Sequence, residues 1–464
     1  MSQAKIALIA FGNEESYGLL IVGGELLRCA QKIKFFDAEE ESVVKRVYGY
    51  RPDFIFFSPM TTFFPKALQI SLSLKRLLPK VTSVFGGHHA MGNPAISKAK
   101  GVDIVVIGPI KGAVEKILGK KEKLIRSKLT RPDDLSLPAR QQYYRDIPRM
   151  ATRYRKIMLS MLGCPWNCSY CGSASGNIGS IFGLEAQKRY YLTRRPLGEV
   201  IAEAKELLKY KTTEIEWVDD DIFAGADAQS WLLEFIDRWA KEISLPMYVS
   251  TTSCNVLKIS SEVLTKLRRI VNCIGMGVQA IRPESLKLFN RSWDNESRMK
   301  AAYDRLKSFG YAVNLQCIIG LPVDDPLEDA LETIKGLQRI GPGSICSCYP
   351  LMIYPGTKME KLCQKRGFKR NPSSNGDTNS GNPGLAFSPR VTKQLRNICK
   401  LATLFVKYGI DEKWMRALIK VDLDDQASKA LSTVRYFECV NDRWKNVKMD
   451  EYFAQIMQST KLRY

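Results

Sequence analysis

Short apolar runs alternate with amphipathic stretches along the first part of the chain. Apolar runs at residues 5–11, 32–36, 54–58, 81–85 and 104–107 predict β-strands. The segments between them repeat apolar residues every three or four positions, as in residues 67–78, and so predict helices. Strands that alternate with helices form a parallel sheet covered on both faces. We therefore expect an α/β domain over residues 1–125.

A second series of the same kind begins at residue 157. Helical patterns, such as residues 199–208 and 327–340, separate six expected strands. These strands are at residues 157–161, 214–218, 247–251, 273–278, 313–319 and 346–353. Six such units predict a (β/α)6 partial barrel over residues 157–366. Catalytic groups of such barrels lie at the carboxyl ends of the strands.

Three further segments complete the predicted organisation. Residues 126–156 form a basic linker, and the polar residues 367–390 form a flexible loop. Residues 391–464 form a helical region that we expect to cap the barrel mouth. Its aromatic side chains Phe405, Trp414, Tyr436 and Trp444 are candidate substrate contacts, although packing in a core explains them more simply.

Composition narrows the classes of function. Lys and Arg number 70 against 48 Asp and Glu, a formal net charge of +22 that favours acidic or polyanionic partners. Only two histidines, His88 and His89, are present, which argues against histidine-based triads and zinc sites. No apolar run approaches the ~20 residues of a membrane span. The first run leads into Glu14 and Glu15, unlike a signal peptide, so we expect a cytoplasmic protein.

Three of the twelve cysteines have a spacing that indicates chemistry. Cys164, Cys168 and Cys171 form C-x-x-x-C-x-x-C directly after the first barrel strand. Three thiolates from one loop can hold three irons of a [4Fe–4S] cluster and leave the fourth iron open to a substrate. A structural zinc site would need a fourth ligand nearby, and the next cysteine is Cys254. Zinc and plain buried thiols stay as alternatives.

This motif resembles the signature of the radical S-adenosylmethionine (SAM) superfamily, in which an aromatic residue, here Tyr170, precedes the third cysteine. The chain is also similar to the subclass with an N-terminal cobalamin-binding domain of flavodoxin-like, Rossmann-like fold. The matching segments are residues 85–94 (FGGHHAMGNP), 135–140 (LSLPAR), 217–223 (WVDDDIF), 277–280 (GVQA), 317–322 (CIIGLP) and 354–357 (YPGT). The resemblance covers residues 1–366.

The resemblance implies three cofactors: a [4Fe–4S] cluster on the three cysteines, SAM and cobalamin. The residues implied for SAM are Tyr170, Asp220, Asp221, Ser253, Gln279 and Gly320. Those implied for cobalamin are Gly12, Ser58, Thr61, Gly86, Gly87, His89 and Gly108. The D-x-H-x-x-G signature of a cobalt-ligating histidine is absent, and residues 108–111 (GPIK) replace the usual Gly-Glu. A flavin site or a substrate-presenting scaffold is therefore the alternative for this domain.

The implied reaction is methyl transfer to an unactivated carbon of a small molecule or peptide. In this family a reduced cluster cleaves SAM to a 5′-deoxyadenosyl radical, with a carrier such as flavodoxin or ferredoxin as reductant. One alternative is a radical SAM cyclase or rearrangement enzyme without methyl transfer. A second is an RNA-modifying enzyme, for which the positive charge is the argument. A non-catalytic iron–sulfur or corrinoid-sensing regulator is the third.

Overall fold

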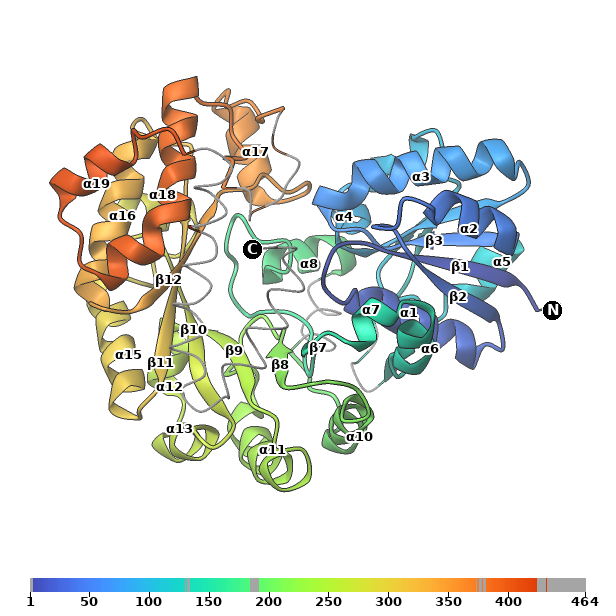
Figure 1. Ribbon diagram of the computed structural model, residues 1–464, viewed down its shortest axis with the longest axis horizontal. Helices are drawn as coiled ribbons and strands as arrows, with labels where there is room; N and C mark the ends of the chain where they lie inside the picture. The colour runs from blue at the N-terminus through green and yellow to red at the C-terminus, as the bar shows by residue number, and fades with distance from the viewer. Residues whose placement is uncertain are drawn as a thin grey trace, which may run out of the picture.

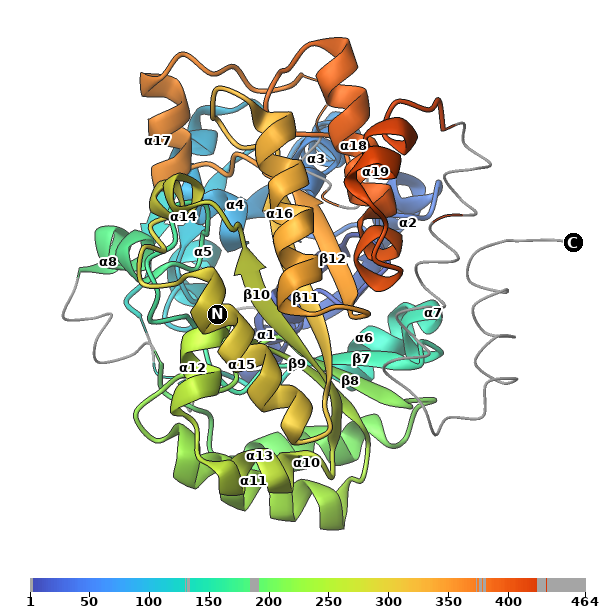
Figure 2. The ribbon, with the colours of Figure 1, turned by 90° about the vertical axis from the view of Figure 1, so that its left-hand side faces the viewer.

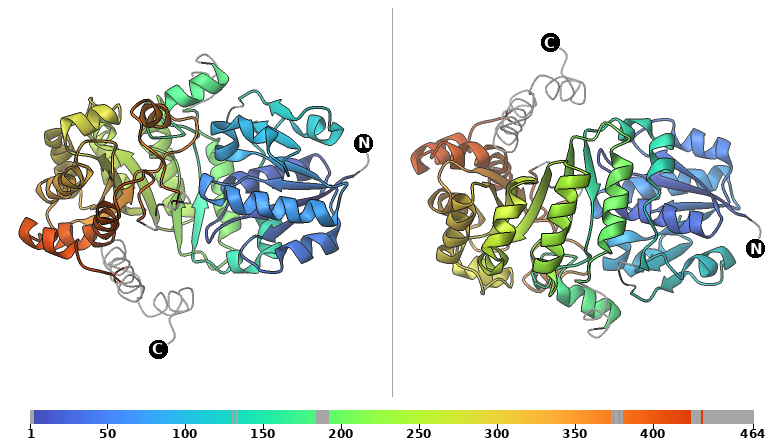
Figure 3. Two further views of the ribbon diagram at one scale, coloured as in Figure 1. Left: turned by 90° about the horizontal axis from the view of Figure 1, so that it is seen from above. Right: turned by 90° about the horizontal axis from the view of Figure 1, so that it is seen from below.

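Two parallel sheets, each covered by its own helices, form the part of the chain that the structure describes. The computed structural model describes residues 3–129, 131, 134–183, 192–372, 374, 378, 381–423 and 431. The N-terminal domain and the barrel domain lie side by side (Figure 1), and views from above and below show the same arrangement (Figure 3). Within these residues, no helix has the length and apolar character needed to cross a bilayer.

The N-terminal sheet is wholly parallel and has the strand order β2-β1-β3-β4-β5-β6. The five strands predicted from apolar runs are confirmed, and the sixth was missed because it is only three residues long and ends in arginine. It straddles the predicted boundary at residue 125. The strands are β1 (Lys5–Ala10), β2 (Lys32–Asp37), β3 (Phe54–Phe57), β4 (Thr82–Phe85), β5 (Ile104–Ile107) and β6 (Leu124–Arg126).

Helices cover both faces of this sheet, as its fully buried central strands β3, β4 and β5 require. The helices α1 (Tyr17–Arg28) and α5 (Val114–Gly119) pack on one face. The helices α2 (Val43–Tyr50) and α3 (Phe64–Leu77) pack on the other. The order reverses between β1 and β3, and ligands of such sheets bind beyond the carboxyl ends of the strands at that point.

The predicted basic linker is largely packed rather than solvated. Its helices α6 (Arg140–Asp146) and α7 (Pro148–Ala151) lie between the two sheets (Figure 1). Arg140 is 2% exposed and donates to Glu203 of the barrel domain (Nη2 to Oε1, 2.7 Å) and to Glu15 of the N-terminal domain (Nη1 to Oε2, 3.2 Å). Glu15 also accepts from the backbone N–H of Ile157 at 2.8 Å. This buried ionic network fixes the two domains against each other.

The second sheet is an open, parallel partial barrel with the order β12-β11-β10-β9-β8-β7, and its six predicted strands are confirmed. The strands are β7 (Arg155–Met158), β8 (Glu214–Trp217), β9 (Met247–Thr252), β10 (Val271–Gln279), β11 (Ala312–Ile319) and β12 (Ile345–Pro350). The helices of this unit are α8 (Ser175–Phe182), α10 (Leu197–Leu207), α11 (Ala228–Glu242), α12 (Ser253–Lys258), α13 (Ser261–Leu267), α14 (Pro283–Leu288), α15 (Glu296–Ser308), α16 (Pro326–Ile340) and α17 (Lys358–Lys365).

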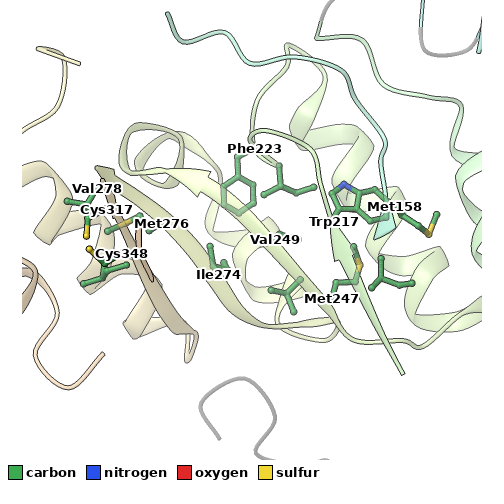
Figure 4. Packing of buried hydrophobic residues seen from close by; sticks show 14 of the residues in the cluster. Met158, Trp217, Phe223, Met247, Val249, Ile274, Met276, Val278, Cys317 and Cys348 are labelled. Carbon is green, nitrogen blue, oxygen red and sulfur yellow. The ribbon is translucent and has the colours of Figure 1, made fainter. Parts of the chain in front are cut away.

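The two faces of the barrel sheet differ in polarity. On the outer face, buried apolar side chains such as Trp217 and Met276 form the core (Figure 4), and the Trp217 ring packs on α11 with its centroid 5.1 Å from that of Phe235. The residues that alternate with them along each strand point to the inner face of the barrel. There the Asn314 amide donates to the hydroxyls of Tyr248 and Ser347, each at 3.0 Å. The barrel interior is therefore hydrogen-bonded and polar.

The C-terminal helices α18 (Pro389–Lys407) and α19 (Glu412–Leu418) close the side of the barrel rather than cap its mouth (Figure 2). The Thr403 hydroxyl donates to the carbonyl of Cys346 on the edge strand β12 at 2.5 Å, so α18 covers that edge. Phe405 is buried, which confirms core packing for this residue, and Trp414 is exposed. Tyr436 and Trp444 lie outside the described residues.

Part of the segment predicted as a flexible loop, residues 367–390, is packed. Leu385 is fully buried and forms an antiparallel bridge with Arg370. The backbone N–H of Gly384 donates to the carbonyl of Leu351 at 3.0 Å. An apolar side chain within a polar stretch explains why composition alone suggested a loop.

Candidate functional site

The carboxyl ends of the two sheets meet at one region of the molecule. Gly92, at the end of α4 (Gly87–Gly92), lies so close to the turn after β12 that a Cβ would collide with the carbonyl of Pro355. A Cβ on Gly108, at the tip of β5, would come within 2.9 Å of the Phe182 ring on α8. Glycine at these positions lets the two domains touch directly.

The N-terminal side of this region is a cradle formed by the ends of β1, β3 and β4. Gly87 has a φ of +78°, and a Cβ there would lie 2.6 Å from the Ser58 hydroxyl. Gly12 has a φ of +79° and packs on the Phe63 ring. The predicted residues Gly12, Ser58, Gly86 and Gly87 are thus brought together at the switch point, and close backbone approach is possible there. Gly108 is set apart, against α8.

His89 belongs to the wall of the cradle. Its ring stacks on Phe64 at 4.1 Å, and its Nδ1 lies 3.2 Å from the Thr61 hydroxyl. Burial, with a smaller effect of Arg370, lowers the pKa of His89 to about 4, so the ring is neutral at pH 7. Its buried Nε2 has no hydrogen-bond partner among the described residues, which fits a polar group of a bound cofactor. The adjacent His88, which the sequence analysis did not select, is the solvent-accessible histidine of the pair.

The three motif cysteines lie on the loop that follows β7. Cys168 is buried, whereas Cys164 and Cys171 are half-buried. The loop is held at several points: Ser169 N–H donates to the carbonyl of Phe289 at 3.0 Å, and the Asn177 amide donates to that of Cys171 at 2.6 Å. The guanidinium of the buried Arg291 donates to Cys168 Sγ at 3.8 Å.

The chemistry of this loop suits an iron–sulfur cluster. Burial raises the pKa of the Cys164 thiol, and it raises that of Cys171 to about 12, with Asp220 and Asp221 adding to these effects. Metal binding must therefore displace protons from these soft sulfur ligands. No three His, Cys, Asp or Glu side chains in the described ranges gather closely enough to hold one metal ion. A cubane cluster spreads its ligands more widely than a single ion does.

Three consecutive aspartates after β8 have different roles. Asp219 is buried and accepts from the backbone N–H groups of Ser160 and Met161 at 2.7 and 3.0 Å, so it anchors the start of the cysteine loop. Asp221 is fully buried and accepts from Thr251, Thr252 and Asn255 at 2.7 to 2.9 Å. The hydrogen-bonding capacity of both carboxylates is largely used within the protein.

Asp220 differs from its two neighbours because solvent reaches its side chain. Desolvation by the surrounding protein is the main reason that the pKa of Asp220 is raised to about 6. Repulsion from the Asp219 carboxylate also raises this pKa, whereas a hydrogen bond with Ser173 lowers it. A carboxylate in this setting gains from a cationic ligand group such as the amine of SAM. Of the three aspartates, it has the most capacity to bind one.

Four further predicted SAM residues surround the barrel mouth. The Ser253 hydroxyl is buried and donates to Asp294 at 2.7 Å, and Asp294 also accepts from Arg291 at 3.1 Å. Gln279 has a φ of +70° at a bulge that ends β10, a strained conformation that is typical of functional sites. The Tyr170 ring packs edge-on against Phe289 at 4.7 Å. Gly320 has a φ of +75° and faces Leu395 of α18 and Phe387 just before that helix.

Asp220→Asn should weaken SAM binding about tenfold, since a hydrogen bond to a charged group contributes about 1.5–3 kcal/mol. Iron content should change little, because Asp220 contributes one hydrogen bond with Ser173 to the cysteine loop, whereas Asp219 accepts from two backbone N–H groups of that loop. Isothermal titration with SAM and iron analysis of the reconstituted protein measure the two quantities. Asp219→Asn is the matched control and should instead lower the iron content. Equal SAM affinity in Asp220→Asn and the unmodified protein would refute this role.

Two family models match the chain in the order of its two sheets. Residues 158–364 match the radical SAM superfamily, and residues 15–118 match the B12 binding domain. Residues 158–364 therefore form a radical SAM domain, and residues 15–118 form a B12-binding domain. The cofactors of the chain are accordingly a [4Fe–4S] cluster, SAM and cobalamin, and the protein is a radical SAM enzyme. The predictions of family, fold class and cofactors are confirmed.

Curated relatives are distant. The hopanoid C-3 methylase of Methylococcus capsulatus is 25% identical over 314 residues, 60% of this chain and 56% of the methylase. The chain thus spans little more than half of that relative. An uncharacterized methyltransferase of Pyrococcus horikoshii is 22% identical over 388 residues, which cover 76% of each chain.

Solved structures share the fold. The methyltransferase TsrM of Kitasatospora setae, with tryptophan and a SAM analogue bound, superposes with a TM-score of 0.66 at 13% identity, over 99% of this chain and 100% of TsrM. The cobalamin-dependent enzyme OxsB gives a TM-score of 0.62 at 12% identity, over 100% of this chain and 76% of OxsB. Both superpositions extend over the N-terminal domain and the barrel domain of this chain.

Sequence reasoning missed the residues that position the cysteine loop. Arg194 is buried and holds Asp219 at 3.2 Å and the carbonyl of Ile222 at 2.7 Å. Arg291 connects Cys168 with Asp294. Neither arginine belongs to a spaced motif, and an isolated arginine in a chain with 70 basic residues gives no signal.

Proposed function

We propose that this protein is a cobalamin-dependent radical SAM methyltransferase that acts on an unactivated carbon of a small molecule or peptide. The observation that carries the proposal is the meeting of the two ligand-binding edges. Phe182, on the first helix after the cysteine loop, lies against Gly108 at the edge of the N-terminal sheet. Bound there, the cofactors supply a 5′-deoxyadenosyl radical and a methyl group. The protein binds and orients them and excludes water.

The relatives favour methyl transfer over cyclisation or rearrangement, because the hopanoid C-3 methylase and TsrM are both named for it. Their substrates differ in polarity. The hydrogen-bonded barrel interior around Tyr248 and Asn314 supports a substrate with polar groups, like the tryptophan of TsrM, rather than a hydrocarbon like a hopanoid. We therefore propose a polar metabolite or peptide residue.

A reducing compartment suits the proposed chemistry. The eleven cysteines in the described part of the chain are all free of disulfides. Free thiols and a reducible cluster both persist in the cytoplasm, where a reduced carrier protein is available. We therefore propose that the enzyme works there and draws electrons from a flavodoxin or ferredoxin.

The proposal is tested with SAM that carries a deuterated methyl group. Protein reconstituted anaerobically with iron, sulfide and hydroxocobalamin should release 5′-deoxyadenosine on reduction, and the label should be recovered on extracted cobalamin. With tryptophan as the first polar probe, and then with peptides that contain it, we expect a labelled product. Release of 5′-deoxyadenosine without label transfer would support a cyclase. Absence of both would support a regulator and overturn the proposal.

A further inference from the structure

A surface cavity lies beside the cysteine loop, apart from the region where the two sheets meet. Its volume is about 600 Å³. It is lined by Trp166 of the cysteine loop, by Cys254 and Lys258 of α12, and by Trp293 and Arg298 near the start of α15. These two helices lie next to each other on the outer side of the barrel (Figure 2). The cavity thus opens where the cysteine loop comes close to solvent.

A continuous set of contacts joins this cavity to a cluster ligand. Cys168 Sγ accepts from Arg291 at 3.8 Å, and the Arg291 guanidinium lies 4.5 Å from the centroid of the Trp293 ring. Trp293 stacks on Trp166, with centroids 4.0 Å apart and planes 21° from parallel. Trp166 also stands between Cys164 and Cys168 in the chain. Electron transfer slows steeply with distance, so a donor bound here is well placed to reduce the cluster.

Two cationic side chains, Lys258 and Arg298, line the cavity. Lys258 is exposed and lies 5.8 Å from the Trp166 ring centroid, and Arg298 is half-buried. Among the described residues neither side chain forms an ion pair, and no acidic side chain lines the cavity. The buried Nε1 of Trp166 has no acceptor in the same part of the chain. Unpaired cations and a free N–H favour a surface that carries carboxylates.

We infer that the cavity around Trp166 and Trp293 is the docking site for a small acidic one-electron carrier protein of the flavodoxin or ferredoxin type. The inference rests on the proposed function, because that function needs a reduced cluster. Lys258 and Arg298 attract the acidic carrier, and the stacked tryptophans lie between it and Cys168. The transfer is of one electron: the carrier is oxidised and the oxidised cluster is reduced, with no bond made or broken.

The test is a charge reversal. In Lys258→Glu/Arg298→Glu, the second-order rate constant for cluster reduction by flavodoxin hydroquinone should fall at least tenfold at low ionic strength, as followed by stopped-flow absorbance. The rate with dithionite, a small anionic reductant that does not need docking, should change much less than the rate with flavodoxin. Reduction of the unmodified protein by flavodoxin should slow steeply as salt is added, and the variant should lose this dependence.

The matched control is Lys211→Glu/Lys241→Glu, which changes the net charge equally. Both lysines are exposed and flank the opposite, amino-terminal end of the barrel strands. An equal loss in both variants would mean that only net charge matters and would overturn the inference. So would an unchanged rate with flavodoxin in Lys258→Glu/Arg298→Glu. A cluster that accepts electrons normally while no label leaves SAM would refute the proposed methyl transfer and leave the docking site standing.

Discussion

Replacing Cys164, Cys168 or Cys171 with alanine, one at a time, should abolish the visible absorption of the [4Fe–4S] cluster and all release of 5′-deoxyadenosine. We propose that these three cysteines hold the cluster, so each substitution removes one of the three ligands that a single loop supplies. The fold should persist, because these cysteines lie on a loop outside the barrel strands. Anaerobic spectra, iron and sulfide analysis, and nucleoside chromatography measure the loss.

Cys317→Ala is the matched control. Cys317 is fully buried on the outer face of β11, close to Cys346 and Cys348 and away from the loop (Figure 4). The substitution leaves a small cavity and should cost about 1–2 kcal/mol of unfolding free energy without loss of iron. If Cys317→Ala lost as much iron as Cys168→Ala, the assignment of the cluster ligands would be wrong.

The strands could be predicted because a buried strand needs a run of apolar residues that are adjacent in the sequence. A strand such as Phe54–Phe57, buried on both faces, must be apolar throughout, and the period of the neighbouring helices follows from their single buried face. Two elements were missed because they lack such a run. Leu124–Arg126 lies at the sheet edge, where three residues and one charge are tolerated. Leu385 is one apolar residue within a polar segment, and its burial depends on distant contacts.

The site was predictable only where chemistry demands a fixed spacing. Three thiolates on one short loop must have a recognisable spacing, so Cys164, Cys168 and Cys171 could be proposed as cluster ligands from the sequence alone. The adjacent carboxylates could be found but not distinguished, because the partners of Asp219 come from the cysteine loop and those of Asp221 from β9 and α12. The same holds for His88 and His89, of which only the structure reveals the exposed one. Tertiary contacts decide such roles, and sequence position does not record them.

Arg140 ends the LSLPAR segment, and its substitution should have the largest effect on stability. Arg140→Met keeps most of the volume but leaves the buried carboxylate of Glu15 without its charge partner and weakens the pairing of Glu203. Removal of one partner of a buried ion network costs about 3–5 kcal/mol. Urea unfolding followed by tryptophan fluorescence should show this loss. Cobalamin binding should weaken as well, since the network holds the two domains together.

Arg145→Met, on the same helix, is the control, because Arg145 is 69% exposed and should change stability by no more than about 0.5 kcal/mol. The pH dependence gives a second readout. Burial alone would raise the pKa of Glu203, but Arg140 and Arg195 hold it below its ordinary value of 4.5. The stabilisation is therefore present above pH 4.5 and is lost as the pH falls through the lowered pKa. The difference between the unmodified protein and Arg140→Met should be largest near pH 7 and narrow in acid, whereas a pH-independent difference would indicate lost packing rather than lost charge pairing.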